Sequence, residues 1–228
     1  AFLRESLEAL RKDLRALGSD LVIRVGAAVD MLDRLRRETG ARHMVSHQET
    51  GNAWTFARDR DVAAWARAQG VAWTELPHSA VRRGPHDRDR WAAARTALLK
   101  IPPLPAPMAL PPVTLPSDPM PEARALMAPD LCPKRQPGGR DEGLGLLASF
   151  LESRGQTYRK AMSTPLEGAT ACSRLSPHLA FGTLTIREVV HATAARQRAL
   201  PPALSSGRDS WKGSLKSFQS RLAWRDHF

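Results

Sequence analysis

Residues 171–182 carry the most specific local pattern of the chain and read Ala-Cys-Ser-Arg-Leu-Ser-Pro-His-Leu-Ala-Phe-Gly. Ser176 is a favourable N-cap, and Pro177 suits the first helical position, where its missing N–H has no helical partner to lose. The pattern therefore predicts a short helix that begins at Pro177 and ends near the closing glycine. Its free N–H groups and positive dipole end would face Ser173 and Arg174, which favours binding of an anion such as phosphate. An ordinary capped helix on the surface is the alternative interpretation.

The composition is that of a globular protein. The chain has 228 residues, of which 42% are hydrophobic, a normal share for a folded core. The sequence contains no apolar run near the roughly twenty residues of a membrane helix, and no secretory signal at its start. Cys132 and Cys172 are too few and too far apart for a disulfide or zinc framework. We therefore expect a cytoplasmic protein without a membrane span or a bound metal, and we expect it to be a monomer.

The charge balance points to a polyanionic partner. Lys and Arg number 34 against 23 Asp and Glu, which gives a net charge of +11 and an isoelectric point near 10.9. A chain this basic favours a partner such as nucleic acid. An arginine-rich proteome encoded by a GC-rich genome would produce the same excess, so this alternative stays open.

The first part of the chain alternates between helical and strand-like patterns. Apolar residues at helical spacing predict helices over residues 2–17, 27–39 and 54–69. Short apolar runs predict strands over residues 20–25, 42–46 and 71–76. This alternation indicates a parallel sheet with helices on its faces. Because the chain opens and closes within helical patterns, we expect it to be a fragment, with the first strand of the sheet missing.

A proline-rich connector follows. Residues 101–121 hold nine of the 18 prolines, a density that excludes a helix or a central strand. We interpret them as an extended, semi-rigid linker preceded by a helix over residues 86–100. A disordered tail is the alternative, although ordered patterns resume afterwards. Arginines just before the linker are interpreted as solvated charge, with DNA contact as the alternative: Arg82, Arg83, Arg88 and Arg90.

The last part of the chain is helical. Apolar spacing predicts helices over residues 141–154, 186–198 and 212–228, with a loop over residues 167–170. Thr185-Ile186-Arg187-Glu188 has the pattern of a capping box at the start of the second of these helices. The sequence thus predicts an α/β fold followed by an all-α fold. We expect an α/β domain, a connector and a helical domain over residues 1–85, 86–140 and 141–228.

Three pieces of the sequence together resemble the photolyase/cryptochrome family. Residues 172–182 resemble the family's flavin-binding signature, usually Thr-Ser-Arg-Leu-Ser-Pro-Tyr-Leu-x-x-Gly. Tyr158 lies upstream, in Tyr-Arg-Lys, where the family has a tyrosine that approaches the flavin. Residues 222–228 are similar to the family's Leu-x-Trp-Arg-Glu-Phe-Tyr. The resemblance implies a Rossmann-like α/β antenna domain, truncated here, followed by the start of a helical FAD-binding domain.

The resemblance also implies which residues contact FAD, with the signature residues at its phosphates and ribityl chain. The implied cofactor-binding residues are Tyr158, Cys172, Ser173, Arg174, Leu175, Ser176, Phe218 and Arg225. Cys172 replaces the family's more usual Thr and loses a strong hydroxyl donor. The spacing from Tyr158 to Ser173 is about two residues longer than in well-known members. A tyrosine that packs at a domain boundary is the alternative for Tyr158.

Two residues are assigned by the resemblance to the pocket for damaged DNA. Trp224 matches a tryptophan that can stack on a flipped base. Arg221 stands three residues earlier, where the best-known dimer-repairing members carry a Glu. Phe218 stands where they carry a Trp, so a base could stack there without an indole N–H. A core Trp beside an exposed Arg is the alternative for Trp224 and Arg225.

The resemblance implies FAD-dependent, blue-light-driven repair of pyrimidine dimers in DNA, as in a deoxyribodipyrimidine photo-lyase. A cryptochrome-like photosensor without repair activity is the second hypothesis, which Arg221 and Phe218 favour. A basic DNA-binding protein without flavin is the third. An antenna pigment of unidentified type is implied near residues 47–52, which follow the second predicted strand, or these residues form a polar loop that caps the next helix. The rest of the FAD pocket and the family's tryptophan electron-transfer chain are expected beyond Phe228.

Overall fold

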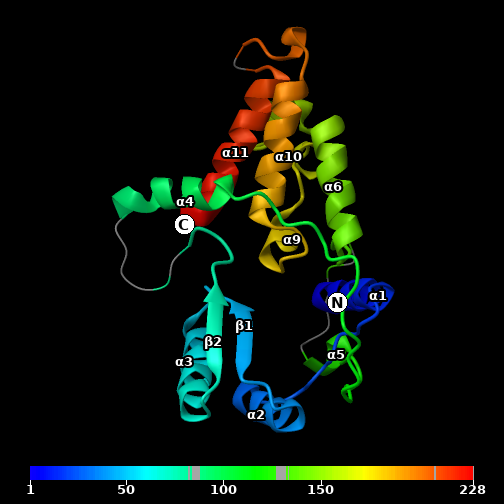
Figure 1. The fold of residues 1–228 in the computed structure, drawn as a ribbon. Helices are drawn as coiled ribbons and strands as arrows, with labels where there is room; N and C mark the ends of the chain where they lie inside the picture. Colours follow the sequence, from blue (N-terminus) through cyan, green and yellow to red (C-terminus); the bar gives the residue numbers. More distant parts are fainter. Residues whose placement is uncertain (82, 84–87, 127–131, 133, 208, 228) are drawn as a thin grey trace.

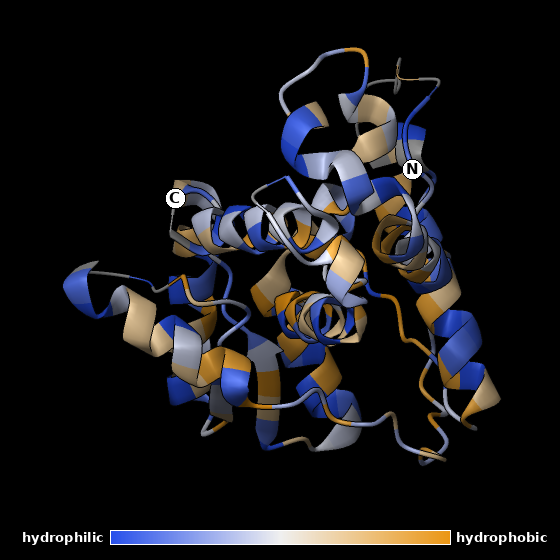
Figure 2. Ribbon diagram, turned by 90° about the horizontal axis from the view of Figure 1, so that it is seen from above, coloured by the Kyte–Doolittle hydropathy of each residue, from blue (hydrophilic) through white to orange (hydrophobic). Residues whose placement is uncertain are grey.

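The computed structural model describes the chain except for residues 82, 84–87, 127–131, 133, 208 and 228 (Figure 1). A small α/β part lies at one end of the molecule and an array of helices at the other. The predicted fold class, α/β followed by all-α, is confirmed. Seen from above, the two ends of the chain lie on opposite sides of the molecule (Figure 2). Of the described helices, none combines the length and the apolar character that crossing a bilayer requires.

The α/β part contains one parallel pair of strands. Its elements are α2 (Ala28–Thr39), β1 (His43–His47), α3 (Ala53–Ala68) and β2 (Ala72–Leu76). The first helix, α1 (Phe2–Ala16), lies against the helical part instead, where the Phe2 ring is 5.1 Å from the His178 ring and 5.3 Å from the Phe181 ring (Figure 1). β1 and β2 pair in parallel, from His43 opposite Ala72 to His47 opposite Leu76, and α3 is the crossover between them. Two strands joined by a helix make a βαβ unit, so the predicted parallel arrangement holds for this pair.

The strand predicted over residues 20–25 is wrong. In the described part of the chain this segment is extended but joins no sheet, and it lies beside the proline-rich linker. Asp118 N donates to Ile23 O at 2.9 Å, and Val25 N donates to the Asp118 carboxylate at 2.9 Å. A regular ladder needs an N–H at each pairing position, and the linker lacks one at every proline. The segment is therefore held by scattered hydrogen bonds instead.

The connector is extended, as predicted, and the helix before it packs on the helical part. It includes the 3-10 turn η1 (Arg88–Arg90), α4 (Trp91–Lys100) and the short helix α5 (Ala123–Leu126). In α4, the Trp91 indole N–H donates to Asp226 O at 2.9 Å. The prediction of solvated charge before the linker is wrong for Arg83, which forms ion pairs with Asp59 and Glu75. Arg82 lies outside the described residues, as does the side chain of Arg88.

The helical part contains the main core. Its elements are α6 (Arg140–Glu152), η2 (Arg154–Thr157), α7 (Tyr158–Ala161), α8 (Gly168–Ala171), α9 (Ser176–Ala180), α10 (Ile186–Ala199), η3 (Pro202–Leu204) and α11 (Trp211–His227). Phe150, Leu184 and Leu215 are completely buried between α6, α10 and α11. The predicted capping box is confirmed, because Glu188 N donates to Thr185 Oγ1 at 3.2 Å and Thr185 N donates to the Glu188 carboxylate at 2.8 Å.

Two local predictions around the signature need correction. Ser176 is inside α9 rather than its N-cap, because Leu179 N already donates to Leu175 O at 2.9 Å and starts the helical bonding one residue earlier. Residues 167–170, predicted as a loop, include most of the one-turn helix α8. That turn forms because Ala171 N donates to Glu167 O at 2.9 Å. Turns this short have no apolar period that would reveal them in the sequence.

Candidate functional site

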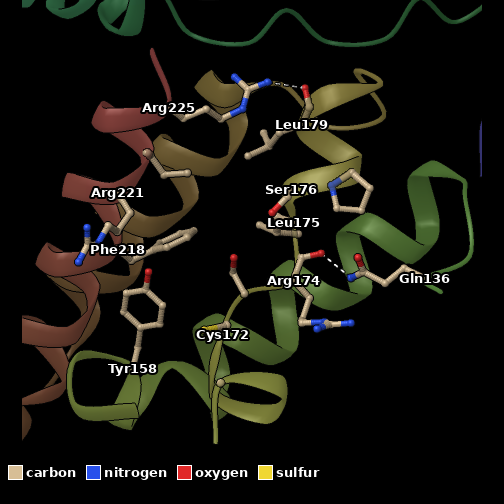
Figure 3. A pocket seen from close by; sticks show the side chains of 14 residues that line it. Gln136, Tyr158, Cys172, Arg174, Leu175, Ser176, Leu179, Phe218, Arg221 and Arg225 are labelled. Carbon is tan, nitrogen blue, oxygen red and sulfur yellow. Dashed lines mark hydrogen bonds between the residues drawn. The ribbon is translucent and has the colours of Figure 1, made fainter. Parts of the chain in front are cut away.

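A pocket of about 760 Å³ opens between α7, the turn before α9, and α11 (Figure 3). It gathers nine of the ten residues that the resemblance assigned to the site. They are Tyr158, Cys172, Ser173, Arg174, Leu175, Ser176, Phe218, Arg221 and Arg225. Trp224 does not line the pocket. The roles of these residues stay predictions, but segments about sixty residues apart in the sequence do meet here.

Aromatic and aliphatic side chains form one wall of the pocket. The Tyr158 ring packs edge-on against Phe150 and Phe218, with centroids 5.5 and 5.7 Å apart, and its hydroxyl points into the pocket (Figure 3). Burial raises the pKa of Tyr158 above its usual value of 10, so the phenol is neutral at pH 7 and can donate a hydrogen bond. Tyr158 thus contributes both to the core and to the pocket. Leu175 and Leu222 extend the apolar surface.

The signature turn forms the opposite, polar wall. Arg174 adopts a left-handed backbone conformation, with φ at 65°, which is uncommon for a residue with a side chain. Its carbonyl accepts a hydrogen bond from Gln136 Nε2 at 2.5 Å, which holds the turn against the end of the connector. The Arg174 side chain is exposed and extends toward the rim, away from Tyr158 and Phe218 (Figure 3). Gln136 carries no motif, and the sequence analysis missed it.

Arg154 fastens the same turn from behind. Its guanidinium donates to the carbonyls of Leu146, Thr170 and Cys172 at 2.9, 3.0 and 2.5 Å, and to Ser149 Oγ at 3.0 Å. Burial lowers the pKa of Arg154, and the nearby charge of Arg174 lowers it further. The sequence analysis placed Arg154 at the end of a helix without assigning it a role. The sequence did contain one signal for this role, because Arg154 is a cation at the C-terminal end of a helix, where backbone carbonyls lack hydrogen-bond partners.

The pocket is strongly cationic. Arg174, Arg221 and Arg225 line it, and none of the described residues that line it is acidic. Arg225 donates to Leu179 O at 3.0 Å and lies 3.8 Å from a carboxylate oxygen of the buried Asp226. Three guanidinium groups beside hydroxyls and a helical turn favour an anionic ligand.

Trp224 lies at the rim and is joined to the pocket through Arg221. The Arg221 guanidinium stacks on the Trp224 ring, 4.0 Å from its centroid, which is a cation–π contact. Trp224 is 51% exposed, so the alternative of a core tryptophan is wrong. The Trp224–Arg221 pair therefore presents an aromatic surface and a cation beside the pocket mouth.

A second pocket, of about 520 Å³, lies where the loops after β1 and β2 meet the turn between α9 and α10. His47 and His78 line it, with ring centroids 5.8 Å apart. Burial lowers the pKa of His78, which keeps its imidazole neutral near pH 7. Asn52 caps α3 by accepting from the backbone N–H groups of Trp54 and Thr55, so the loop over residues 47–52 does cap the next helix. The same loop also lines this second pocket.

Comparisons with known proteins identify related proteins. Residues 1–84 match the family DNA photolyase. The chain is 31% identical over 247 residues to a deoxyribodipyrimidine photo-lyase of Streptomyces griseus, an alignment that covers 99% of this chain and 48% of the relative. It is 29% identical over 244 residues to the deoxyribodipyrimidine photo-lyase of Halobacterium salinarum, covering 100% of this chain and 49% of that protein. The chain therefore spans about half the length of the curated relatives it matches.

Solved structures show the same fold. A bacterial class III photolyase from Agrobacterium tumefaciens is similar with a TM-score of 0.75 and 22% identity, over 99% of this chain and 48% of that one. A Synechocystis cryptochrome is similar with a TM-score of 0.71 and 19% identity, over the same shares of the two chains.

Proposed function

The chain belongs to the photolyase/cryptochrome family, and from this premise we propose that its main pocket binds FAD and that the whole protein repairs pyrimidine dimers in DNA with blue light. The proposal draws on its relatives, which are deoxyribodipyrimidine photo-lyases at about 30% identity. We also retain the division into an antenna domain, a connector and a FAD-binding domain, over residues 1–85, 86–140 and 141–228.

The charge of the pocket is the observation that carries the FAD assignment. FAD has a pyrophosphate, which needs cations and N–H or O–H donors and is repelled by carboxylates. Arg174 stands beside Ser173 and Ser176 on the polar wall, and the described lining residues include no Asp or Glu. Residues of this chain therefore match the anionic half of the cofactor. Arg154 supports that match by fixing the carbonyls of the turn away from the pocket.

The apolar wall matches the other half of the cofactor. Tyr158, Phe218 and Leu222 offer an apolar, water-excluding surface for a ring system, with the neutral Tyr158 hydroxyl as a hydrogen-bond donor. Arg225, on the same helix as Phe218, donates to Leu179 O and so joins α11 to α9 beside the pocket. When bound, FAD supplies the light-driven electron transfer, whereas the protein supplies binding and orientation.

The rim residues suggest how damaged DNA is recognised. The exposed Trp224 ring can stack on an unstacked base. The Arg221 guanidinium, which only donates hydrogen bonds, can bind a pyrimidine carbonyl oxygen or a phosphate but cannot accept from a base N–H. Lesion recognition in this protein thus uses a cation where well-known dimer-repairing members use a carboxylate.

Repair of a thymine dimer in a short oligonucleotide by the full-length, flavin-loaded protein tests the proposal. We expect light-dependent restoration of the undamaged strand, and none in the dark. Retained flavin that can be reduced, without repair of this lesion, would contradict dimer repair. A purified full-length protein without flavin absorbance would contradict the FAD assignment itself and favour a DNA-binding protein.

A cryptochrome-like FAD photosensor is the second candidate. Arg221 and Phe218 favour it, because they replace the carboxylate and the indole expected on the lesion side. Absence of repair on both a thymine dimer and a 6-4 photoproduct, with flavin that still responds to light, would select this candidate. In either case we place an antenna pigment, if one is bound, in the second pocket between His47, His78 and the turn after α9.

A further inference from the structure

We propose that the outward face of α11 binds the phosphate backbone of a DNA strand and leads that strand to Trp224 at the pocket rim. The inference rests on the proposed function, since it names the path of the DNA partner. We call this face the α11 stripe, and its residues are Lys212, Lys216, Ser220 and Trp224.

The four residues of the α11 stripe follow one another at intervals of four, so they lie on one side of the helix. All four are exposed, whereas Leu215, Phe218 and Leu222 on the other side of α11 are buried in the core. At about 1.5 Å rise per residue, the stripe is about 18 Å long. Because each strand of B-DNA rises about 3.4 Å per nucleotide, the stripe can span about five nucleotides.

The chemistry of the stripe is that of phosphate binding. An open hollow of about 620 Å³ lies over its first three residues, lined by cations and hydroxyls that include Arg159, Lys212, Lys216, Ser210, Ser217 and Ser220. None of the described residues that line this hollow is acidic. Phosphate oxygens in protein–DNA complexes are bound by this mixture of cations and hydroxyl side chains.

One carboxylate lies near the hollow and reduces the positive charge at one end of it. Asp209 lies 3.5 Å from Arg159 and 3.7 Å from Lys160, so it offsets part of their charge at the N-terminal end of α11. Arg159 also donates to Ser217 Oγ at 3.2 Å, which holds it against the helix. Lys212 and Lys216 have no ion pair with any carboxylate of the described residues. These two lysines therefore carry the free positive charge of the stripe.

The stripe is continuous with the candidate site. Its last residue, Trp224, is stacked under the Arg221 guanidinium, and Arg221 lines the main pocket. A strand held along Lys212 and Lys216 would reach Trp224 after about two further helical turns. A base leaving that strand would then meet an aromatic ring and a cation beside the pocket.

The test compares Lys212→Ala/Lys216→Ala with the unchanged full-length, flavin-loaded protein. The probe is a short fluorescein-labelled duplex that carries one thymine dimer, with the undamaged duplex in parallel, and binding is followed by anisotropy over a series of salt concentrations. Losing two phosphate contacts should make the negative slope of log affinity against log salt concentration shallower by about 1.8. Affinity should fall by a similar factor for damaged and undamaged duplexes, because phosphates carry no lesion information.

The control is Lys12→Ala/Arg60→Ala, which removes two exposed cations from α1 and α3, away from α11 in Figure 1. It should leave the slope within about 0.3 of the unchanged protein. The proposal would be overturned if the salt slope changed equally in both double variants, or if it did not change in the stripe variant. Repair by the unchanged protein would still leave the proposed function intact in that case. If the unchanged protein retains flavin but binds neither duplex, the proposed repair function and the stripe fall together. Unaltered flavin absorbance in the stripe variant establishes that its pocket is folded.

Discussion

The helical part and the α/β part of this chain are stabilised in different ways. In the helical part, Phe150, Leu184 and Leu215 are fully buried, and the aromatic rings of Phe150, Tyr158 and Phe218 pack together. In the α/β part, Val45 on β1 is 66% exposed and Trp54 at the start of α3 is 72% exposed. Two strands of five residues bury little surface by themselves.

The α/β part buries few apolar side chains, among them Val62 on α3, and carries ion pairs on its surface. Arg34 pairs with Glu38 at 2.9 Å, and Arg37 pairs with Asp33 at 2.5 Å. Contacts of this kind contribute little each and are screened by salt, whereas buried apolar surface is not. The candidate site therefore lies on the part of the chain that has its own apolar core.

The largest expected loss of stability comes from a change in that core. Phe150→Ala should lower the free energy of unfolding by about 3–5 kcal/mol, because it removes a fully buried ring that supports Tyr158 and Phe218. Val45→Ala, which shortens an exposed side chain on β1, should change it by no more than about 0.5 kcal/mol. Urea unfolding followed by far-UV circular dichroism measures both. Equal losses in the two variants would refute the contrast between the two parts.

A smaller effect is expected at the turn that Arg154 holds. Arg154→Met should lower the free energy of unfolding by about 2–3 kcal/mol, because the carbonyls of Leu146, Thr170 and Cys172 lose a charged donor. It should also weaken FAD binding, measured as quenching of flavin fluorescence during titration. Arg154→Lys is the control for charge, since it keeps the cation but not the fork of donors. FAD affinity unchanged in Arg154→Met would show that the turn does not need this clamp.

Helix caps allow the same change to be made in both parts. Asn52→Ala at α3 and Thr185→Ala at α10 each remove a side-chain cap and should each cost about 1 kcal/mol. The Thr185 variant also breaks a capping box in a helix packed on the core, so its cost should appear in the main unfolding transition. Hydrogen exchange of the backbone amides should locate the Asn52 effect in α3 alone. A global effect from Asn52→Ala would mean that the two parts unfold as one.

The smallest effect is expected at Glu5, where α1 meets the end of the connector. Arg135 and the backbone N–H of Gly138 lower the pKa of Glu5 from 4.5 to about 2. A carboxyl whose pKa is depressed by folding stabilises the folded state above its unfolded value, and this contribution is lost as pH falls from about 4.5 to about 2. Because Glu5 is about a third exposed, Glu5→Gln should cost only about 0.5–1 kcal/mol at pH 7.

Thermal unfolding of the unchanged protein and Glu5→Gln over a pH series checks this effect. The difference between them should be constant near neutral pH, shrink as the pH falls below about 4.5 and approach zero near pH 2. A difference that persists at low pH would show that Glu5 acts through packing and not through its charge.

Sequence patterns predicted the local elements well where local rules apply. The helix starting at Ile186 follows from the capping box, and the paired strands follow from short apolar runs near residues 43–47 and 72–76. Predictions failed where an element forms only if another backbone segment lies beside it. The segment over residues 20–25 has a strand-like sequence, but a strand exists only if another backbone offers N–H and C=O groups in register.

The chemical groups of the site can be read from the amino-acid sequence. They lie in the signature over residues 172–182, in Tyr158 and in residues 222–228. The three-dimensional packing was needed to show that nine of those side chains line one pocket, that Trp224 lies at its rim, and that Gln136 and Arg154 hold the turn. The physical reason is that periodicity and capping act over a few residues, whereas a pocket is formed by the packing of helices that the chain brings together over long distances.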